Sequence, residues 1–216
     1  MLKTEIIDAY LLPDFSEYIG HELTTRELTS ASSVLNEAFS KWQGSTEDFY
    51  KNSSDYLLAL VSFNLASHYK LRWYGIQNIR KSKVLDFGCG IGTISIYLAN
   101  QGNQVLGYDV NKKAIDFANW RVAKHNFQNM EFTTIRPDCT DFDFILAIDV
   151  LEHFENLAEV LKDLASTMKM GAKFYHYDVF ETNPNCLQHF DHSKQIDTYI
   201  VKAGLKKFNQ FWAIKV

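Results

Sequence analysis

The chain has 216 residues, of which 46% are hydrophobic and 14% aromatic, enough for one packed α/β domain with an added helical segment. Its 22 basic and 26 acidic residues give a formal charge of −4, and the short basic cluster from Arg80 to Lys83 makes no stripe for a phosphate backbone, which argues against a large nucleic-acid partner. Three scattered cysteines, acids near the start and the lack of an apolar run of about 18 residues predict a cytoplasmic protein with no disulfide framework, secretory signal or membrane span.

Residues 1–78 are expected to form an N-terminal helical cap, ahead of a main domain over residues 79–216. Capping residues, apolar spacing and glycine stops predict the helices of this segment. One runs from Thr29 or Ser30 through Trp42 to a stop at Gly44, and a second from Ser53 or Ser54 through His68 and Leu71 to a stop at Gly75.

From Lys83 onward, strand and helix patterns alternate, which predicts parallel strands joined by right-handed crossovers. The expected strands cover 84–87, 104–108, 131–135, 144–148, 172–177, 206–210 and 211–216, and the expected helices cover 93–100, 112–125, 155–169 and 194–203. The sequence therefore predicts a seven-stranded α/β sheet with helices on both faces. Its ligand should lie beyond the carboxyl ends of the strands.

Three closely spaced glycines follow the first strand of this domain. Asp86 leads into Gly88, Gly90 and Gly92, which allow positive φ or a close backbone approach to a ligand. A dinucleotide fingerprint would place the third glycine at position 93, which is Thr93. The string resembles motif I of the class I S-adenosylmethionine (SAM) dependent methyltransferases, commonly E/D-x-G-x-G-x-G.

Two further blocks support this resemblance. The second strand, QVLGYDV, ends with Asp109, and the block FDFILAIDVLEHF places an acid at the end of the fourth strand and an EH pair after it. The resemblance implies a Rossmann-like sheet, mostly parallel with an antiparallel last strand, and a helical cap over the methyl acceptor. Residues 80–180 carry most of it, and the first 75 residues are unmatched.

The resemblance implies SAM as the cofactor and assigns roles to single residues. Asp86 positions the methionine part, the glycines supply open backbone, and Asp109 accepts hydrogen bonds from the ribose hydroxyls. Asp138, after the third strand, is the candidate for the adenine. The full set of expected cofactor contacts is Asp86, Gly88, Cys89, Gly90, Gly92, Asp109, Val110, Asp138 and Asp149.

Asp149, Glu152 and His153 stand at i, i+3 and i+4, so a helix that began by 149 would place them on one face. This pattern resembles the small-RNA end methyltransferases, in which such a block and a later histidine, here His189 or His192, hold a divalent ion. Position 149 is Asp where that family has Glu, and the chain lacks a basic RNA footprint. We therefore expect no metal ligands.

Methyl transfer needs a base only when the acceptor arrives protonated. His153 and His176 are the candidate catalytic bases, and His176 shares one side of its strand with Asp178. Tyr50, just before the second capped helix, and His189 are the candidate acceptor contacts. The NPN at 183–185 lacks the aromatic residue of an NPPY motif and is interpreted as a turn.

The sequence thus predicts an enzyme that moves a methyl group from SAM to an O or N atom of a small molecule. Three alternatives stay open: metal-dependent methylation of an RNA terminus, a nicotinamide-dependent oxidoreductase, and a SAM-binding partner subunit without turnover. The acceptor and the oligomeric state are not determined by the sequence.

Overall fold

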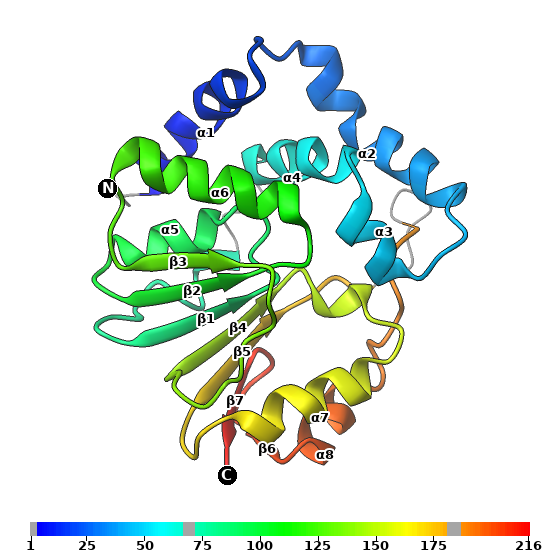
Figure 1. Ribbon diagram of the computed structural model, residues 1–216. Coiled ribbons are helices and arrows are strands. Elements are labelled where there is room, and N and C mark those ends of the chain that lie inside the picture. Colours follow the sequence, from blue (N-terminus) through cyan, green and yellow to red (C-terminus); the bar gives the residue numbers. More distant parts are fainter. Residues whose placement is uncertain (1–3, 67–71, 181–186) are drawn as a thin grey trace.

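The computed structural model describes residues 4–66, 72–180 and 187–216 (Figure 1). Four helices come first, followed by a main domain in which strands and helices alternate. The N-terminal helices are α1 (Thr4–Ile19), α2 (Thr25–Ser40), α3 (Thr46–Asn52) and α4 (Asp55–Leu65). The main domain contains β1 (Lys83–Phe87), α5 (Thr93–Ala99), β2 (Gln104–Tyr108), α6 (Lys112–His125), β3 (Met130–Thr133), β4 (Phe144–Ile148), the 3₁₀ turn η2 (Leu151–His153), α7 (Leu157–Thr167), β5 (Lys173–Tyr177), α8 (Ile196–Lys202), β6 (Leu205–Lys207) and β7 (Trp212–Lys215).

The seven strands form one sheet in the order β3-β2-β1-β4-β5-β7-β6. Neighbouring strands from β3 to β5 pair in parallel, and β7 runs antiparallel to both β5 and β6. Strand order reverses between β1 and β4, the place where ligands of open α/β sheets bind. The predicted fold class, including the antiparallel last strand, is confirmed.

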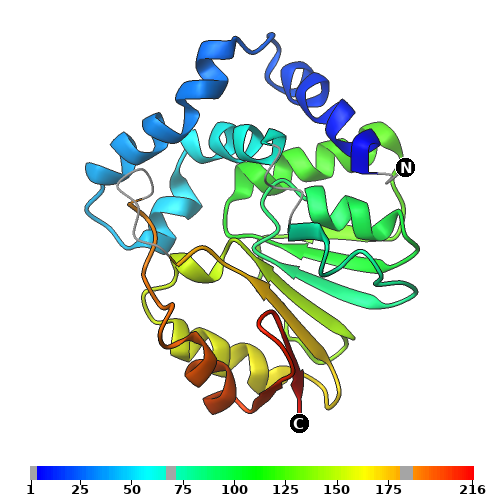
Figure 2. The ribbon, with the colours of Figure 1, turned by 180° about the vertical axis from the view of Figure 1, so that it is seen from behind.

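Alternating side chains of the strands build two apolar layers, one on each face of the sheet. Leu85 of β1 packs with Leu161 of α7 on one face, whereas Val84 packs with Ile96 of α5 on the other. Figure 2 shows, from behind, the helices that cover the faces of the sheet. Burying one such side chain stabilises the fold by about 1.5–3 kcal/mol. Because both faces are covered, the strand ends are the free places for a site.

The structure corrects the expected start of the first cap helix. α2 begins at Thr25, with Thr24 as its N-cap, and not at Thr29 or Ser30. The Thr24 side chain accepts from the backbone N–H of Glu27, whose carboxylate accepts from the Thr24 backbone N–H in return. This capping box was readable in the sequence as T-x-x-E and satisfies two orphan donors of the helix.

The second cap helix is shorter than expected. α4 begins after Ser54, as predicted, but ends at Leu65 because Ala66 takes extended backbone angles. The predicted helical positions His68 and Leu71 lie outside the described residues, as does the predicted turn at 183–185. The short helix α3 was not expected, although Ser45 caps it by accepting from the N–H of Asp48 at 3.1 Å.

The N-terminal helices pack on the main domain through a third apolar cluster. Ile91, in the glycine turn after β1, lies in this cluster with Phe15 of α1, Val61 of α4 and Phe117 of α6. The helices therefore cover the turn itself, above the sheet in Figure 1. None of the described helices has the length and apolar content needed to cross a membrane.

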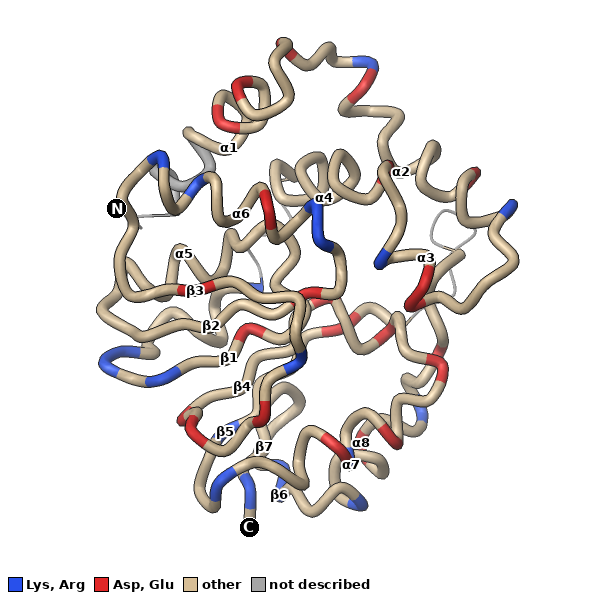
Figure 3. The backbone as a smooth tube through the Cα atoms, viewed as in Figure 1, with Lys and Arg blue, Asp and Glu red and all other residues tan. Residues whose placement is uncertain are grey.

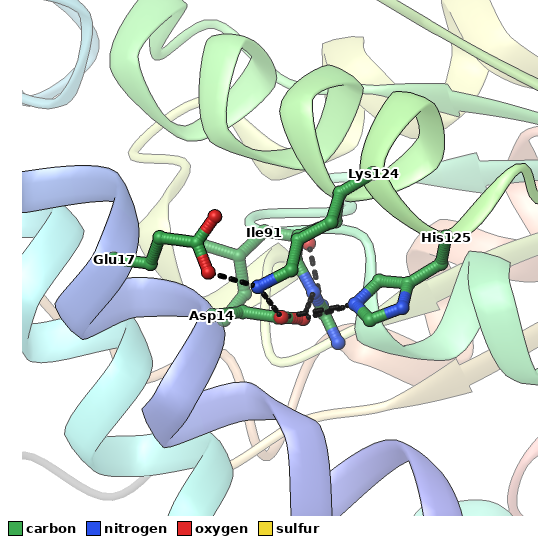
Figure 4. A network of polar contacts seen from close by, with 6 residues as sticks. Asp14, Glu17, Ile91, Lys124 and His125 are labelled. Atoms are coloured by element: carbon green, nitrogen blue, oxygen red, sulfur yellow. Dashed lines mark hydrogen bonds and ion pairs between the residues drawn. The ribbon is translucent and has the colours of Figure 1, made fainter.

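A buried carboxylate ties α1 to α6 (Figure 4). Asp14, whose side chain is 1% exposed, lies 3.5 Å from Arg121 Nε, 3.0 Å from Lys124 Nζ and 2.8 Å from His125 Nε2. Arg121 is equally buried, and its NH1 group also donates to the carbonyl of Ile91 at 3.3 Å. The carboxylate thus offsets the buried guanidinium and holds it under the glycine turn.

Replacing Asp14 by Ala should destabilise the protein by about 3 kcal/mol, because the buried Arg121 charge would lose the buried carboxylate that faces it. Chemical denaturation followed by circular dichroism measures the loss. Glu17→Ala is the matched control, since Glu17 also contacts Lys124, at 2.6 Å, but is 62% exposed. The control should cost below about 1 kcal/mol. Equal losses in the two variants would contradict a dominant role for Asp14.

Candidate functional site

Acidic residues gather where β1, β2 and β4 end (Figure 3). Asp86 lies within β1, Asp109 follows β2 and Asp149 follows β4, all at the same edge of the sheet. The structure therefore brings together three of the predicted cofactor residues. Elsewhere along the trace, Lys and Arg positions are interspersed with Asp and Glu positions.

The backbone conformation and the close packing of the turn both exclude side chains at its glycines. Gly88 and Gly92 have φ values of 77° and 75°. A Cβ on Gly88 would lie 2.4 Å from Cγ2 of Val150, and one on Gly92 would lie 2.4 Å from Cζ of Phe132. Gly90, at φ 53°, faces Leu60 of α4. The turn needs glycine for both reasons, and the N–H groups of Gly88 and Gly92 donate to the carbonyls of Tyr108 and Cys89.

Asp109 holds this turn in place. Its Oδ2 atom accepts from the N–H of Gly90 at 2.9 Å, and its Oδ1 atom accepts from the N–H of Asn111 at 2.8 Å. Burial raises the pKa of the Asp109 carboxyl to about 6, against the two hydrogen bonds, which lower it. Each carboxylate oxygen has a further lone pair, so the group has acceptor capacity for two ligand hydroxyls.

Asp86 lies on the face of β1 that α5 covers. Its Oδ2 atom accepts from the hydroxyl of Ser95 at 2.6 Å, and burial raises the pKa of its carboxyl to about 6. Cys89 is part of the turn, where its N–H donates to the carbonyl of Tyr108 at 2.9 Å. Ser95, which the sequence analysis did not single out, orients Asp86 from the first turn of α5.

The end of β4 differs from the expectation. Asp149 has a φ of 51°, and the following residues form only the 3₁₀ turn η2, so Asp149, Glu152 and His153 do not share a helical face. The Asp149 carboxylate pairs with Nε of Arg72. The Arg72 guanidinium lies 5.1 Å from the ring centres of both Phe63 and Tyr177. Sequence reasoning missed Arg72, because nothing around it marks a site.

The cap helices bring a tyrosine to the predicted histidines. The Tyr50 hydroxyl of α3 lies 2.9 Å from Nδ1 of His153, with the two rings edge to face at 4.8 Å. The rings of His153 and His189 are also 4.8 Å apart. Burial lowers the pKa of His153 to about 3, so the ring is neutral at physiological pH. The predicted acceptor contacts Tyr50 and His189 thus lie together beside a predicted base.

A second tyrosine connects this group to the strand ends. The ring of Tyr56, in α4, packs against that of Tyr50 at 4.7 Å. Burial, and then the negative charge of Asp109, raise the pKa of the Tyr56 hydroxyl well above its usual value. Tyr56 therefore lies between the expected cofactor side and the expected acceptor side.

Two buried carboxyls lie behind the histidines. Glu152 is 1% exposed, and its Oε1 atom accepts from the N–H of Val179 at 3.3 Å. Burial, and then the charge of Asp178, raise the pKa of Glu152 well above its usual value; burial, and then the charge of Asp149, do the same for the pKa of Asp178. Both carboxyls have one buried oxygen without a hydrogen-bond partner, Oε2 of Glu152 and Oδ1 of Asp178.

Among the described residues, one group has donor atoms spaced for a metal ion. Glu152, His153 and His189 offer ligand atoms within 4.8 Å of one another. Two members of the set considered in the sequence analysis lie elsewhere: Asp149 pairs with Arg72, and His192 Nε2 contacts the carbonyl of Phe154 at 2.8 Å. Nδ1 of His153 contacts the Tyr50 hydroxyl, so Nε2 is the ring nitrogen with which His153 would bind a metal ion.

The remaining predicted residues lie apart from this group. His176 is 5% exposed; its Nδ1 atom is 2.6 Å from Asp178 Oδ2, and its ring stacks on Phe174. Burial lowers the pKa of His176 to about 4. Val110 packs against the apolar layer of α7, and Asp138 is exposed in the loop after β3. Their predicted roles stay predictions.

A mostly parallel sheet with a glycine turn after β1 and an acid after β2 defines a Rossmann-like protein that binds a nucleoside cofactor. A family model described as a methyltransferase domain matches residues 59–208. A ubiquinone biosynthesis O-methyltransferase of Coxiella burnetii (strain Dugway 5J108-111) is 26% identical over 151 residues, covering 68% of this chain and 63% of that protein. The sterol 4-C-methyltransferase strm-1 of Caenorhabditis elegans is 28% identical over 128 residues, covering 56% of this chain and 38% of that protein.

Solved structures share the fold. Phosphoethanolamine N-methyltransferase 2 of Haemonchus contortus, in complex with SAM, matches with a TM-score of 0.61 at 17% identity, over 77% of this chain and 46% of that chain. The [4+2]-cyclase SpnF matches with a TM-score of 0.57 at 14% identity, over 97% of this chain and 75% of that chain. Identities this low show the fold alone.

The chain belongs to the methyltransferase domain family, in the class I SAM-dependent superfamily, as its glycine spacing predicts. SAM is the cofactor of this family, which sets aside the nicotinamide alternative. The positive φ glycines of the turn and the free lone pairs of Asp109 fit a nucleoside that carries a ribose. The chain spans 63% of the length of the Coxiella relative.

We expect the affinity for SAM to fall about tenfold between pH 7 and pH 5. In the predicted contact, ribose hydroxyls would donate to the ionised Asp109 carboxylate, and protonation around its pKa of about 6 would remove that acceptor. Calorimetric titration at a series of pH values measures the effect. Asp109→Asn should bind SAM more weakly at pH 7 and lose most of the pH dependence. Any pH dependence that is left in this variant would be assigned to Asp86. A flat profile in the native protein would contradict a ribose contact through Asp109.

Proposed function

We propose that this protein transfers a methyl group from SAM to an oxygen or nitrogen atom of a small molecule. One observation carries the proposal: the glycine turn with Asp109 lies at the same sheet edge as Tyr50 and His153, with Tyr56 between them. This proximity supports a cofactor site that lies next to an acceptor site. Alignment of the two reactants is the main requirement of an in-line displacement.

On the cofactor side, Asp109 binds the ribose and the turn from Gly88 to Gly92 lies against the amino-acid part, which Asp86 helps to position. Arg72, buried at the same edge, is the proposed partner of the cofactor carboxylate. Arg72 would then exchange its ion pair with Asp149 for one with the cofactor, and Asp149 would be released to bind the cofactor ammonium. Val110 and Asp138 remain proposed contacts of the adenosine.

On the acceptor side, SAM supplies an electrophilic methyl group, and the cap helices keep water away from it. His153 is proposed to take the proton of an acceptor hydroxyl, because its ring is neutral at physiological pH and Tyr50 holds its Nδ1 side. The low pKa makes His153 a weak base, so this role suits an acidic hydroxyl such as a phenol better than an aliphatic alcohol. An amine that arrives neutral needs no base.

The names of the relatives support a small-molecule acceptor without selecting the atom. They describe O-methylation in ubiquinone biosynthesis, C-methylation of a sterol and N-methylation of phosphoethanolamine. The name of SpnF describes a cyclase, so turnover has to be measured and not inferred from the fold. The cytoplasmic location and the division at residue 78 remain predictions.

Calorimetry with SAM and with its demethylated product, S-adenosylhomocysteine (SAH), tests the cofactor site. Transfer of a labelled methyl group to a panel of phenols, amines and alcohols tests the reaction. Binding of either compound together with a labelled product supports the proposal. Binding without any product would favour the partner-subunit alternative, and an EDTA-sensitive reaction with unchanged SAM binding would favour metal-assisted methylation. No binding heat with either compound would overturn the proposal.

Replacing His153 by Gln should lower kcat for a phenol acceptor by about 100-fold or more, the usual contribution of a positioned base. Steady-state kinetics with labelled SAM measures this loss. The affinity for SAH should stay within about twofold, because His153 lies on the acceptor side. Activity of the variant that rises strongly with pH, as the phenol ionises in solution, is the expected signature. An undiminished kcat would remove His153 as the base.

A further inference from the structure

Asn111 connects the cofactor side of the site with the cap. It is 1% exposed and stands at the N-cap of α6. Its backbone N–H donates to Asp109 Oδ1 at 2.8 Å, and its side-chain oxygen accepts from the N–H of Ala114 at 2.9 Å. Its side-chain nitrogen donates to the carbonyls of Tyr50 at 2.5 Å and Ser53 at 3.3 Å.

The side-chain nitrogen is more than the helix cap requires. An N-cap needs an acceptor oxygen, which Ser, Thr or Asp supplies as well as Asn. The amide nitrogen serves a different helix, because Tyr50 lies in the last turn of α3 and Ser53 is its C-cap. Carbonyls in the last turn of a helix have no partner within that helix. One buried side chain therefore joins the start of α6 to the end of α3.

From Tyr50 the contacts continue to the acceptor side. The same residue whose carbonyl binds Asn111 places its hydroxyl 2.9 Å from His153 Nδ1 and its ring 4.7 Å from that of Tyr56. α3 has seven residues, so a shift of its last turn would move the Tyr50 ring with it. The position of Tyr50 against His153 thus depends on where Asn111 holds the backbone.

We propose that Asn111 is a positioning residue that couples cofactor binding at Asp109 to the placement of Tyr50 against His153. A ribose bound to Asp109 keeps the carboxylate ionised and its hydrogen bond to the Asn111 N–H strong, which fixes the α6 cap and, through the amide nitrogen, the end of α3. By linkage, the factor by which cofactor binding stabilises this position of α3 is also the factor by which this position of α3 strengthens cofactor binding. This inference rests on the proposed function, since it takes SAM or SAH as the ligand of Asp109.

Two substitutions of Asn111 distinguish the role of its side-chain nitrogen from its role as the N-cap of α6. Asn111→Ser retains a capping oxygen and deletes the donor without adding charge. Asn111→Asp retains the cap and the shape but turns an oxygen toward the carbonyls of Tyr50 and Ser53. Ser45→Ala is the matched control, because it removes the cap at the other end of α3 and leaves the Asn111 contacts in place. Circular dichroism checks that each variant folds.

The measurement is hydrogen exchange of the backbone amides of residues 46–53, with and without saturating SAH. In the native protein SAH should slow this exchange by at least about fivefold, the lower range of measured site-to-site coupling. Ser45→Ala should exchange faster throughout but show the same slowing ratio. Asn111→Ser and Asn111→Asp should still bind SAH, with the ratio reduced below about twofold.

The outcomes distinguish the coupling from the proposed function. If SAH binds the native protein and both Asn111 variants, and the slowing ratio is unchanged, the coupling is overturned and the proposed function stands. The coupling is also overturned if SAH binds the native protein without slowing exchange of residues 46–53. If the native protein does not bind SAH, both the coupling and the proposed function fail. Should Asn111→Ser not fold, Asn111→Asp decides the question alone.

Discussion

The site depends on the carboxylate of Asp109 and on the two backbone N–H groups that it accepts from. One belongs to Gly90, in the turn after β1, and the other to Asn111, at the start of α6. A single buried acid thus fixes two loops that come from neighbouring strands of the sheet. Burial alone would favour a neutral carboxyl, and the two N–H donors oppose that tendency. Each carboxylate oxygen accepts one of these two hydrogen bonds and keeps a further lone pair at the sheet edge, where a ribose is expected.

Negative charge at this edge is distributed over separate partners. Asp86 is held by Ser95, Asp109 by backbone donors and Asp149 by Arg72. Among the described residues, Oε2 of Glu152 and Oδ1 of Asp178 are buried without such a donor, and burial raises the pKa values of both carboxyls. A cationic sulfonium with an ammonium group suits surroundings of this kind, in which carboxylates outnumber cations. The arrangement therefore supports the proposed cofactor on electrostatic grounds as well as on backbone geometry.

The N-terminal helices pack on the glycine turn and also contribute residues to the candidate site. Phe15 and Val61 pack on Ile91, so the cap stabilises the glycine turn that it covers. The buried Asp14 charge anchors α1 to α6 on the far side, whereas Asn111 joins α3 to α6 on the site side. α6 thereby contacts both the residues of the glycine turn and the end of α3. Tyr50 of α3 reaches His153 in the turn that follows β4, and its ring also packs on Tyr56 of α4.

The sequence by itself determined the sheet, the glycine turn and the acid after β2, because these rest on local patterns of apolar residues, glycine and strand ends. It also contained the capping box at Thr24 and Glu27, which marks the start of α2 more accurately than Thr29 does. Tertiary structure alone decided that Arg72 meets Asp149, that Tyr50 meets His153 and that Asn111 joins two helix ends. These partners are 77, 103 and 61 or 58 positions apart in the chain, so no local pattern encodes them. The positive φ of Asp149, which breaks the expected helical face, likewise follows from the packing around the end of β4.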